Sequence, residues 1–178
     1  MATDTTDIEA LKSVAEGDRA GMKLLYDRYS DGLNSFALNW LSDPFEASDV
    51  VHETMLEVWR SAGKFAGKSS VKTWIFSIAR NKSIDRNRKA VKSVVGEIDE
   101  TIQDSSLDPE AVTSAFEDVK RVRACIDSLS PAHKSVIHLA FYEDLTYGEI
   151  SNLEGSPVGT IKTRIMHAKR LLMRCLGQ

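Results

Sequence analysis

Apolar residues recur along most of this chain at intervals of three or four, which is the spacing of one face of an α-helix. The intervals predict helices at about 7–16, 19–40, 44–61, 71–89, 119–129 and 131–142, followed by a helix-turn-helix. In the second helix, Leu25, Leu33, Phe36 and Leu38 are among the residues expected in the core. Alternation with a period of two is scarce, so strands are not expected. The chain is therefore predicted to be all-α.

The helical pattern is lost between residues 90 and 117. This stretch contains Gly96, Ser105, Ser106 and the pair Asp108-Pro109, and residues 97–118 hold eight Asp or Glu and no Lys or Arg. Such a composition is typical of a flexible, solvated connector. We therefore expect two small helical domains, at 1–89 and 118–178, joined by an acidic linker at 90–117.

The segment from Leu145 to Ile165 predicts two short helices separated by a tight turn. Thr146 and Glu149 have the spacing of a capping box, and Gly155 can end the first helix. Ser156 is the expected N-cap of the second helix, with Pro157 at its first position. The second helix is expected to turn outward Lys162, Thr163, Arg164, Met166, His167 and Arg170. This arrangement predicts a helix-turn-helix whose second helix lies in the major groove of DNA.

Charge is strongly segregated, although the formal net charge is only −3. Residues 1–59 carry twelve acidic residues and four Lys or Arg, whereas residues 60–92 carry ten Lys or Arg and one acid. Beyond Glu154 there are five Lys or Arg and no acid. Two basic blocks separated by an acidic one predict two surfaces that bind polyanions.

The remaining titratable residues do not form a recognisable catalytic or metal site. His133 and His138 are five residues apart and lack a neighbouring carboxylate, so we interpret them as surface histidines. Cys125 and Cys175 lie in apolar segments and are interpreted as buried, reduced thiols rather than as a disulfide. Because neither a phosphate-binding loop nor a nucleophile elbow is present, we expect no cofactor, no metal and no enzymatic activity.

The N-terminus lacks the basic-then-apolar pattern of a signal peptide. Apolar runs also stay well short of the roughly 18 residues that a membrane-spanning helix needs. The protein is therefore expected in the cytoplasm.

Three segments, in order and spacing, resemble the extracytoplasmic-function sigma factors, the minimal class of the bacterial sigma-70-type family. Residues 43–59 are similar to the family's polymerase-binding helix, residues 65–85 to its −10-element segment, and residues 158–164 to its −35-reading helix. The resemblance implies a sigma region 2 domain followed by a sigma region 4 domain. It also implies a subunit that directs RNA polymerase to promoters and a cognate anti-sigma factor that sandwiches between the two domains.

The helix after Pro44 carries acidic residues at positions i, i+4 and i+8, which form a stripe with apolar neighbours. By itself the pattern favours an ordinary solvated face with Trp59 in the core. The resemblance instead implies contact with the clamp helices of the polymerase β′ subunit. The residues assigned to this contact are Asp49, His52, Glu53, Leu56, Glu57 and Trp59. The family usually has glutamine at the position of His52.

The basic block combines cations with aromatic residues, as proteins that bind single-stranded DNA do. The resemblance implies that the loop 64–70 captures an unpaired −10 base and that Arg80 and Asn81 hold the adjacent strand. The residues assigned to the −10 element are Lys64, Phe65, Lys68, Ser69, Ser70, Lys72, Arg80, Asn81 and Arg88. Trp74 is expected in the core, whereas Phe76 could serve either the core or the DNA.

The second basic block is expected to read duplex −35 DNA. The residues assigned to it are Pro157, Gly159, Thr160, Lys162, Thr163, Arg164, Met166, His167 and Arg170. Arg164 could equally be a structural or a phosphate-binding residue. His167 stands where the family often has arginine, so the preferred −35 sequence is expected to differ from the family's common element.

Two other functions remain open from the sequence. A response-regulator-type transcription activator would use the same helix-turn-helix as a dimer on duplex DNA, and a helical adaptor would carry the basic patch incidentally. Both leave the motifs between residues 44 and 89 unexplained. The partners expected are therefore core RNA polymerase, promoter DNA and an anti-sigma factor, with neither a membrane nor a small-molecule substrate.

Overall fold

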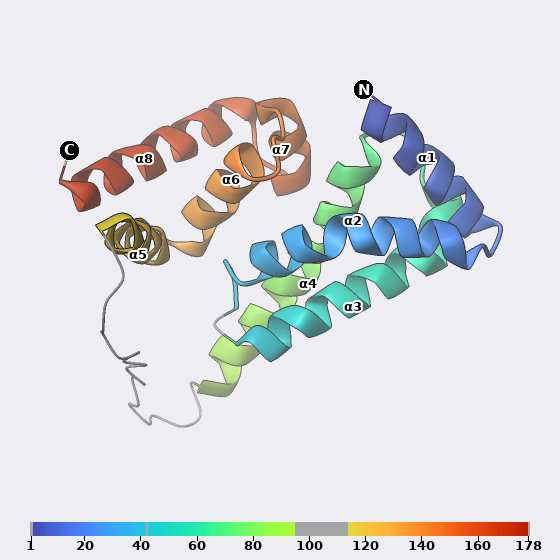
Figure 1. Cartoon of the computed structure of the whole chain (residues 1–178), viewed down its shortest axis with the longest axis horizontal. Coiled ribbons are helices and arrows are strands. Elements are labelled where there is room, and N and C mark those ends of the chain that lie inside the picture. Colours follow the sequence, from blue (N-terminus) through green and yellow to red (C-terminus); the bar gives the residue numbers. More distant parts are fainter. Residues whose placement is uncertain (1, 42, 95–113, 178) are drawn as a thin grey trace.

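A computed structural model of the chain describes residues 2–41, 43–94 and 114–177. Its regular elements are α1 (Ala2–Ala15), α2 (Arg19–Ala37), α3 (Pro44–Ser61), the 3-10 turn η1 (Ala62–Lys64), α4 (Val71–Val94), α5 (Ser114–Asp127), α6 (Pro131–Phe141), α7 (Tyr147–Glu154) and α8 (Val158–Leu176). Within these ranges every regular element is helical, which confirms the all-α prediction. The helices form an N-terminal group, α1–α4, and a C-terminal group, α5–α8 (Figure 1).

The N-terminal group packs around side chains at helical spacing on α2, α3 and α4. Leu25, Leu33 and Phe36 of α2 are fully buried, as the sequence predicted. Phe76 of α4 is also fully buried and packs edge to face on Phe36, with 5.6 Å between ring centroids. Its role is therefore in the core. Burial of each such side chain contributes about 1.5–3 kcal/mol.

Leu38 is not part of this core, because its side chain is 38% exposed. The helix predicted to reach residue 40 ends at Ala37, and Leu38 follows it with right-handed helical backbone angles. At helical spacing Leu38 falls on the side of α2 roughly opposite Leu25 and Phe36, so it points away from the core. Trp74 packs against the edge of the core, as expected.

The C-terminal group has a smaller core between α6, α7 and α8. It is formed by Val136 and Leu139 of α6, Ile150 of α7, and Ile161 and Ile165 of α8, all buried. This core fixes the angle between the two helices of the predicted helix-turn-helix. The described helices also extend into both ends of the predicted linker 90–117, because α4 continues to Val94 and α5 begins at Ser114. The rest of that linker, residues 95–113, lies outside the described residues.

Local capping explains where several helices begin. Asp43 accepts a hydrogen bond from the Phe45 amide at 2.8 Å, and Pro44 occupies the first turn of α3. Thr146 and Glu149 form the predicted capping box, and the helix that they start ends at Gly155 with φ +60°. That left-handed conformation favours glycine because it has no Cβ to clash.

The predicted N-cap at Ser156 is wrong. Helix α8 begins at Val158, and Pro157, with extended ψ 146°, stands in the N-cap position without a side-chain cap. The carbonyl of Ser156 instead accepts a hydrogen bond from the Ser151 hydroxyl at 2.6 Å. Ser156 therefore belongs to the turn between the two helices, which is one residue longer than predicted.

Candidate nucleic-acid and protein interfaces

The acidic stripe predicted on α3 is engaged by cations of α4. Arg86 contacts Glu46, lies 3.5 Å from the Asp49 carboxylate and donates to Glu53 at 2.5 Å. Lys82 lies 3.6 Å from Glu53. The hydrogen bond from Arg86 lowers the pKa of Glu53, although partial burial opposes it. Two of the carboxylates assigned to polymerase therefore also join α3 to α4.

The neighbouring side of α3 forms an apolar groove with α2. Leu56 and Trp59 are 54% and 37% exposed there, so the interpretation that places Trp59 in the core is wrong. Tyr26 of α2 stacks on His52 with 6.5 Å between ring centroids. The groove is lined by Arg19, Met22, Lys23, Tyr26, His52, Met55, Leu56 and Trp59. An exposed apolar surface with a polar rim is typical of a protein–protein interface. Glu57, also assigned to polymerase, is half-buried on α3.

The end of η1 and the loop that joins it to α4 present cations beside an aromatic pair. Lys64 and Lys68 are exposed, and Gly67 between them has φ +67°, a conformation that favours glycine. Phe65 is half-buried and packs on Trp74, with 5.2 Å between ring centroids. Ser69 donates to the carbonyl of Ser70 at 3.2 Å. The loop is therefore anchored by its aromatic residue and leaves its two lysines in solvent.

The first turns of α4 contact the C-terminal group. Lys72 donates to the Glu143 carboxylate and to its backbone carbonyl, both at 2.7 Å. Arg80 lies 3.1 Å from the Glu154 carboxylate. The hydroxyl of Ser70, which accepts from the Thr73 amide, lies 3.4 Å from Glu149. Three residues assigned to the −10 element are thus in contact with acidic residues, whereas Asn81 and Arg88 farther along α4 are exposed.

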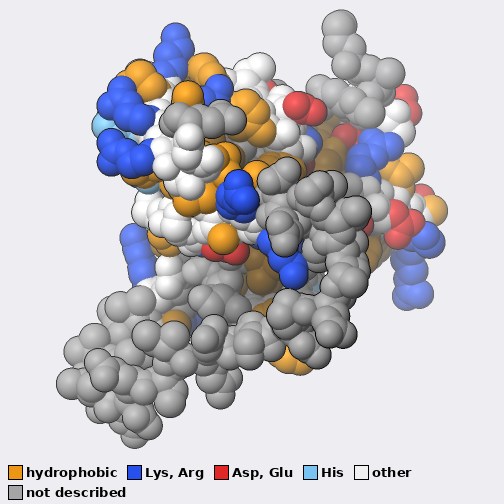
Figure 2. Space-filling view, turned by 60° about the vertical axis from the view of Figure 1, so that its left-hand side comes forward, with side chains coloured by type: hydrophobic (Ala, Val, Ile, Leu, Met, Phe, Trp, Pro, Cys, Tyr) orange, Lys and Arg blue, Asp and Glu red, His pale blue; other side chains and the backbone are white. Residues whose placement is uncertain are grey.

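The outer face of α8 is largely open. Met166 is 50% exposed. Also exposed on this face are Thr160, Lys162, Thr163, His167 and Arg170. In Figure 2 the molecule is turned so that the C-terminal group comes forward. Lys and Arg side chains gather around hydrophobic ones in the upper left of this view. Pro157 and Gly159 lie at the amino end of the helix, where the helix dipole favours anions.

Arg164 differs from its neighbours on α8. Its guanidinium lies 3.5 Å from the Glu154 carboxylate, and its side chain is 25% exposed. The structure therefore gives Arg164 a structural contact, which the sequence left open. Near it, His133 lines a shallow depression together with Gly159 and His167. Burial, with the charges of Arg164 and His167, lowers the pKa of His133.

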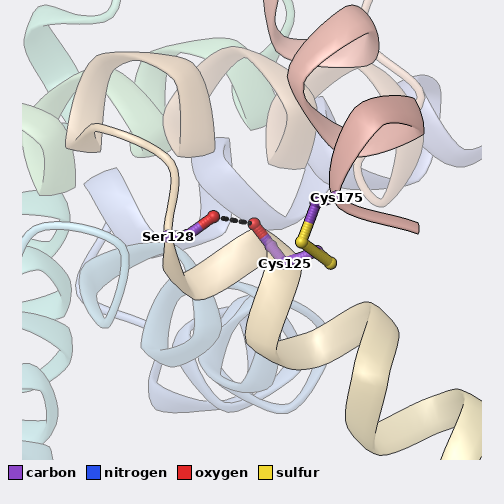
Figure 3. Close-up of a disulfide and its surroundings, with 3 residues drawn as sticks. All are labelled: Cys125, Ser128 and Cys175. Carbon is purple, nitrogen blue, oxygen red and sulfur yellow. Dashed lines mark hydrogen bonds between the residues drawn. A yellow bond between two sulfur atoms is a disulfide. The ribbon is translucent and has the colours of Figure 1, made fainter. Parts of the chain in front are cut away.

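A disulfide between Cys125 of α5 and Cys175 of α8 helps to position α8, so the prediction of two reduced thiols is wrong (Figure 3). The two Cα atoms are 5.8 Å apart although the residues are 50 positions apart in sequence. Periodicity reports which face of a helix is apolar, but it cannot show that α5 lies beside the last turns of α8. The Ser128 hydroxyl donates to the carbonyl of Cys125 at 2.7 Å and closes the last turn of α5.

The interpretation of His138 as a surface histidine is also wrong, because its side chain is buried. Its ring stacks on Tyr142 and packs edge to face on Phe36 of the N-terminal group, with 5.8 Å between the second pair of centroids. Its Nε2 lies 3.2 Å from Glu143. Sequence spacing could not predict this packing, because the partner residues of His138 lie in both groups. In the described part of the chain, no three His, Cys, Asp or Glu side chains are placed to share a metal ion.

Comparison with known proteins matches both groups to one family. The model of Sigma-70 region 2 matches residues 25–93, and that of Sigma-70 region 4 matches residues 120–172. The ECF RNA polymerase sigma factor SigK of Mycobacterium sp. (strain JLS) is 32% identical over 97% of this chain and 92% of its own length. The chain belongs to the ECF sigma factors. SigL of Mycobacterium tuberculosis (strain H37Rv), another such factor, is 30% identical over 94% of this chain and 96% of its own.

Two solved structures share the fold of this chain. The sigma factor RpoE in complex with the anti-sigma factor NepR from Bartonella quintana is 25% identical, with a TM-score of 0.72, over 87% of this chain and 96% of its own. CnrH in complex with the cytosolic domain of CnrY has a TM-score of 0.71 at 20% identity, over 97% of each chain, which shows the fold alone.

As an ECF sigma factor, the protein directs transcription initiation and is not an enzyme. This confirms the function expected from the motifs and excludes the activator and the adaptor, because the region 2 match covers the segments that both left unexplained. None of the helices in the described ranges combines the length and the apolar character that a bilayer crossing needs.

Proposed function

We propose that this ECF sigma factor binds core RNA polymerase through the groove between α2 and α3, melts the −10 element with η1 and α4, and reads the −35 element with α8. The observation that carries the proposal is the exposure of Leu56 and Trp59 on the last turns of α3, a few residues before the exposed lysines of the loop 64–70. A polymerase-docking surface next to a strand-binding surface lets one domain hold the enzyme and the melted DNA together.

For polymerase, the proposed partner is the pair of clamp helices of the β′ subunit. Leu56 and Trp59 supply the apolar contact, and His52, stacked on Tyr26, lines the same groove. Glu57 adds charge at the rim, where it steers association more than it adds affinity. Asp49 and Glu53 keep 63% and 45% of their side chains exposed while they pair with Arg86, so they remain part of the proposed contact.

For the −10 element, we propose that the protein binds a base that has flipped out of the DNA duplex. Lys64 and Lys68 approach the phosphates, and Gly67 lets the backbone of the loop come close to the base. Phe65 and Ser69 line the loop, while Asn81 offers an amide to a base edge and Arg88 a charge to a phosphate. Unstacking a base costs a few kcal/mol, which binding of the extruded base and its phosphates offsets.

For the −35 element, α8 is proposed to enter the major groove. Lys162, Thr163, Met166 and His167 reach base edges, because their side chains are exposed on one side of the helix. Thr160 and the amides around Gly159 hold phosphates at the amino end, and Arg170 adds a phosphate contact. Arg164 acts through Glu154 in positioning α8.

The proposed domains follow these roles. Residues 1–89 form the region 2 domain, with α4 continuing to Val94, and residues 118–178 form the region 4 domain, with α5 beginning at Ser114. Residues 90–117 join them. Because relatives such as RpoE are found in complex with anti-sigma factors, we propose an anti-sigma partner for this chain as well. The site of action is the cytoplasm, where bacterial polymerase and promoters are found.

Affinity for core polymerase tests the docking surface. We expect Leu56→Ala and Trp59→Ala each to weaken binding of bacterial core polymerase about tenfold or more, since central apolar residues dominate such interfaces. Leu171→Ala is the matched control, because Leu171 is also exposed, at 43%, but lies on α8. Equal affinity of all three variants and the wild type would contradict the proposed docking surface.

A further inference from the structure

The part of the −10 surface formed by Ser70, Lys72 and Arg80 is covered by the C-terminal group, and each polar contact there involves an acidic residue. Lys72 pairs with Glu143, the hydroxyls of Ser70 and Thr73 lie 3.4 Å from Glu149, and Arg80 pairs with Glu154. We call Glu143, Glu149 and Glu154 the acidic cap. The contacts follow one side of α4 over about two turns, so they form a surface rather than a single ion pair.

The acidic cap is held in place by its own domain. The side chain of Glu154 is only 3% exposed, and it accepts from the Ser135 hydroxyl at 2.7 Å while facing both Arg80 and Arg164. Glu149 is fixed by the capping box of α7. The carboxylates are therefore presented to α4 in fixed positions, and little side-chain entropy is lost when the contact forms.

The two domains also approach closely where α2 meets the loop after α6. A Cβ on Gly32 would come 2.6 Å from the Glu143 carboxylate, so glycine lets that carboxylate lie against α2. His138 packs on Phe36 beside it. Burial tends to raise the pKa of Glu143, but hydrogen bonds from His138 and Lys72 and their charges hold it below its usual value. The carboxylate is thus ionised in this contact near neutral pH.

Carboxylates and phosphates compete for the same donors. An ammonium, a guanidinium and a pair of hydroxyls are groups that hold the phosphates of nucleic acids. In this structure they hold carboxylates of the same chain. The match is incomplete, because Nε of Arg80 is buried with no hydrogen-bond partner in the described structure. A phosphate that engaged the whole guanidinium would recover that bond.

We propose that the acidic cap acts as an intramolecular competitor of the −10 strand, so that the free protein masks the part of its strand-binding surface formed by Ser70, Lys72 and Arg80 until the two domains separate. The inference rests on the proposed assignment of Lys72 and Arg80 to −10 DNA. The outer face of α8 stays open in the masked state, since Lys162, Met166 and His167 are exposed. Masking therefore acts on single-stranded DNA and not on duplex DNA.

Two full-length variants open the contact without changing a residue assigned to DNA. Gly32→Met places a side chain where Glu143 now lies, and glycine-to-methionine within α2 also favours the helix. The double variant Glu143→Gln/Glu149→Gln removes two of the charges and keeps the shapes of the side chains. Ala20→Met, on the exposed first turn of α2, is the matched control for the first variant.

The measurement is fluorescence anisotropy with a labelled mixed-sequence single strand of about 16 nucleotides, compared with a duplex of the same sequence. Small-angle X-ray scattering of the same samples reports separation of the domains. We expect both opening variants to bind the single strand at least about tenfold more tightly than the wild type. This is the gain expected when about nine-tenths or more of the free wild-type protein is masked. Their duplex affinity and the behaviour of Ala20→Met should match the wild type.

Opened variants with unchanged affinity for the single strand would overturn the masking, and so would variants that neither open nor bind better. A further variant adds Lys72→Ala and Arg80→Ala to the Gly32→Met chain. It distinguishes failure of the masking hypothesis from failure of the assignment of these two residues to −10 DNA. If the added changes leave strand binding at the opened level, the assignment of these residues to DNA is wrong. If they abolish the gain, the assignment holds and the cap is the competitor.

Discussion

The two cationic helices α4 and α8 have similar charge in the sequence but differ in what surrounds them. On α4, Lys72 and Arg80 contact the acidic cap, and Arg86 contacts carboxylates of α3. On α8, Lys162 and Arg170 are exposed. Among the α8 residues assigned to the −35 element, Arg164 is the one that contacts Glu154. A basic segment therefore indicates that a surface can bind a polyanion, whereas the availability of that surface depends on the fold.

Loss of the disulfide should have the strongest effect on the C-terminal group, because this bond links α5 to α8 across 50 residues. We expect Cys125→Ser/Cys175→Ser to destabilise the C-terminal group by about 2–4 kcal/mol. The melting temperature, followed by circular dichroism in oxidising buffer, should fall on the order of 10 °C. The wild type in excess reductant should melt like the variant, and melting at the wild-type temperature in both cases would contradict a stabilising cross-link.

The next effect separates α4 from α8 in function. Asn81 is exposed on α4 beyond the acidic cap, and we expect Asn81→Ala to reduce open-complex formation roughly tenfold to a hundredfold through loss of a base contact. Permanganate reactivity of unpaired thymines on a promoter bound by the holoenzyme measures it. Duplex −35 binding should not change, and Asn152→Ala, exposed on α7, is the control. Equal loss of melting and duplex binding would contradict two separate surfaces.

The smallest effect distinguishes base reading from phosphate contact. Lys162→Ala should change the preferred −35 base, with a loss of about fivefold at one position, as deletion of a single polar contact implies. Arg88→Ala, on α4, should weaken holoenzyme–promoter binding evenly across sequences and reduce the salt slope by about one unit. Binding selection followed by sequencing compares the two. An even loss for Lys162→Ala would place it on the phosphate backbone.

The sequence predicted features that depend on nearby residues. The α3 start at Asp43 and Pro44, the capping box of Thr146 and Glu149, and the stop at Gly155 follow from side chains within a few positions of each other. The three family motifs are likewise continuous segments. These local patterns gave the helices and the order of the domains, but the N-cap at Ser156 shows that a boundary can still shift by a residue.

What the sequence could not predict depends on how distant helices meet. Arg80 and Glu154 are 74 residues apart, and the burial of His138 depends on Phe36 in the other group. Leu38 was expected in the core, but it lies off the face of α2 that carries Leu25 and Phe36 and is exposed. The role of Arg164 was open for the same reason, since its partner Glu154 sits on a different helix. Periodicity identifies a face without identifying what covers it.

Run-off transcription would show whether this protein directs core polymerase to promoters. Purified bacterial core polymerase would be supplied with a promoter library, with and without this protein, and the transcripts sequenced. We expect transcripts only with the protein present, from templates that share a −35 and a −10 element. Tight duplex binding with neither core binding nor promoter-selective transcripts would contradict it.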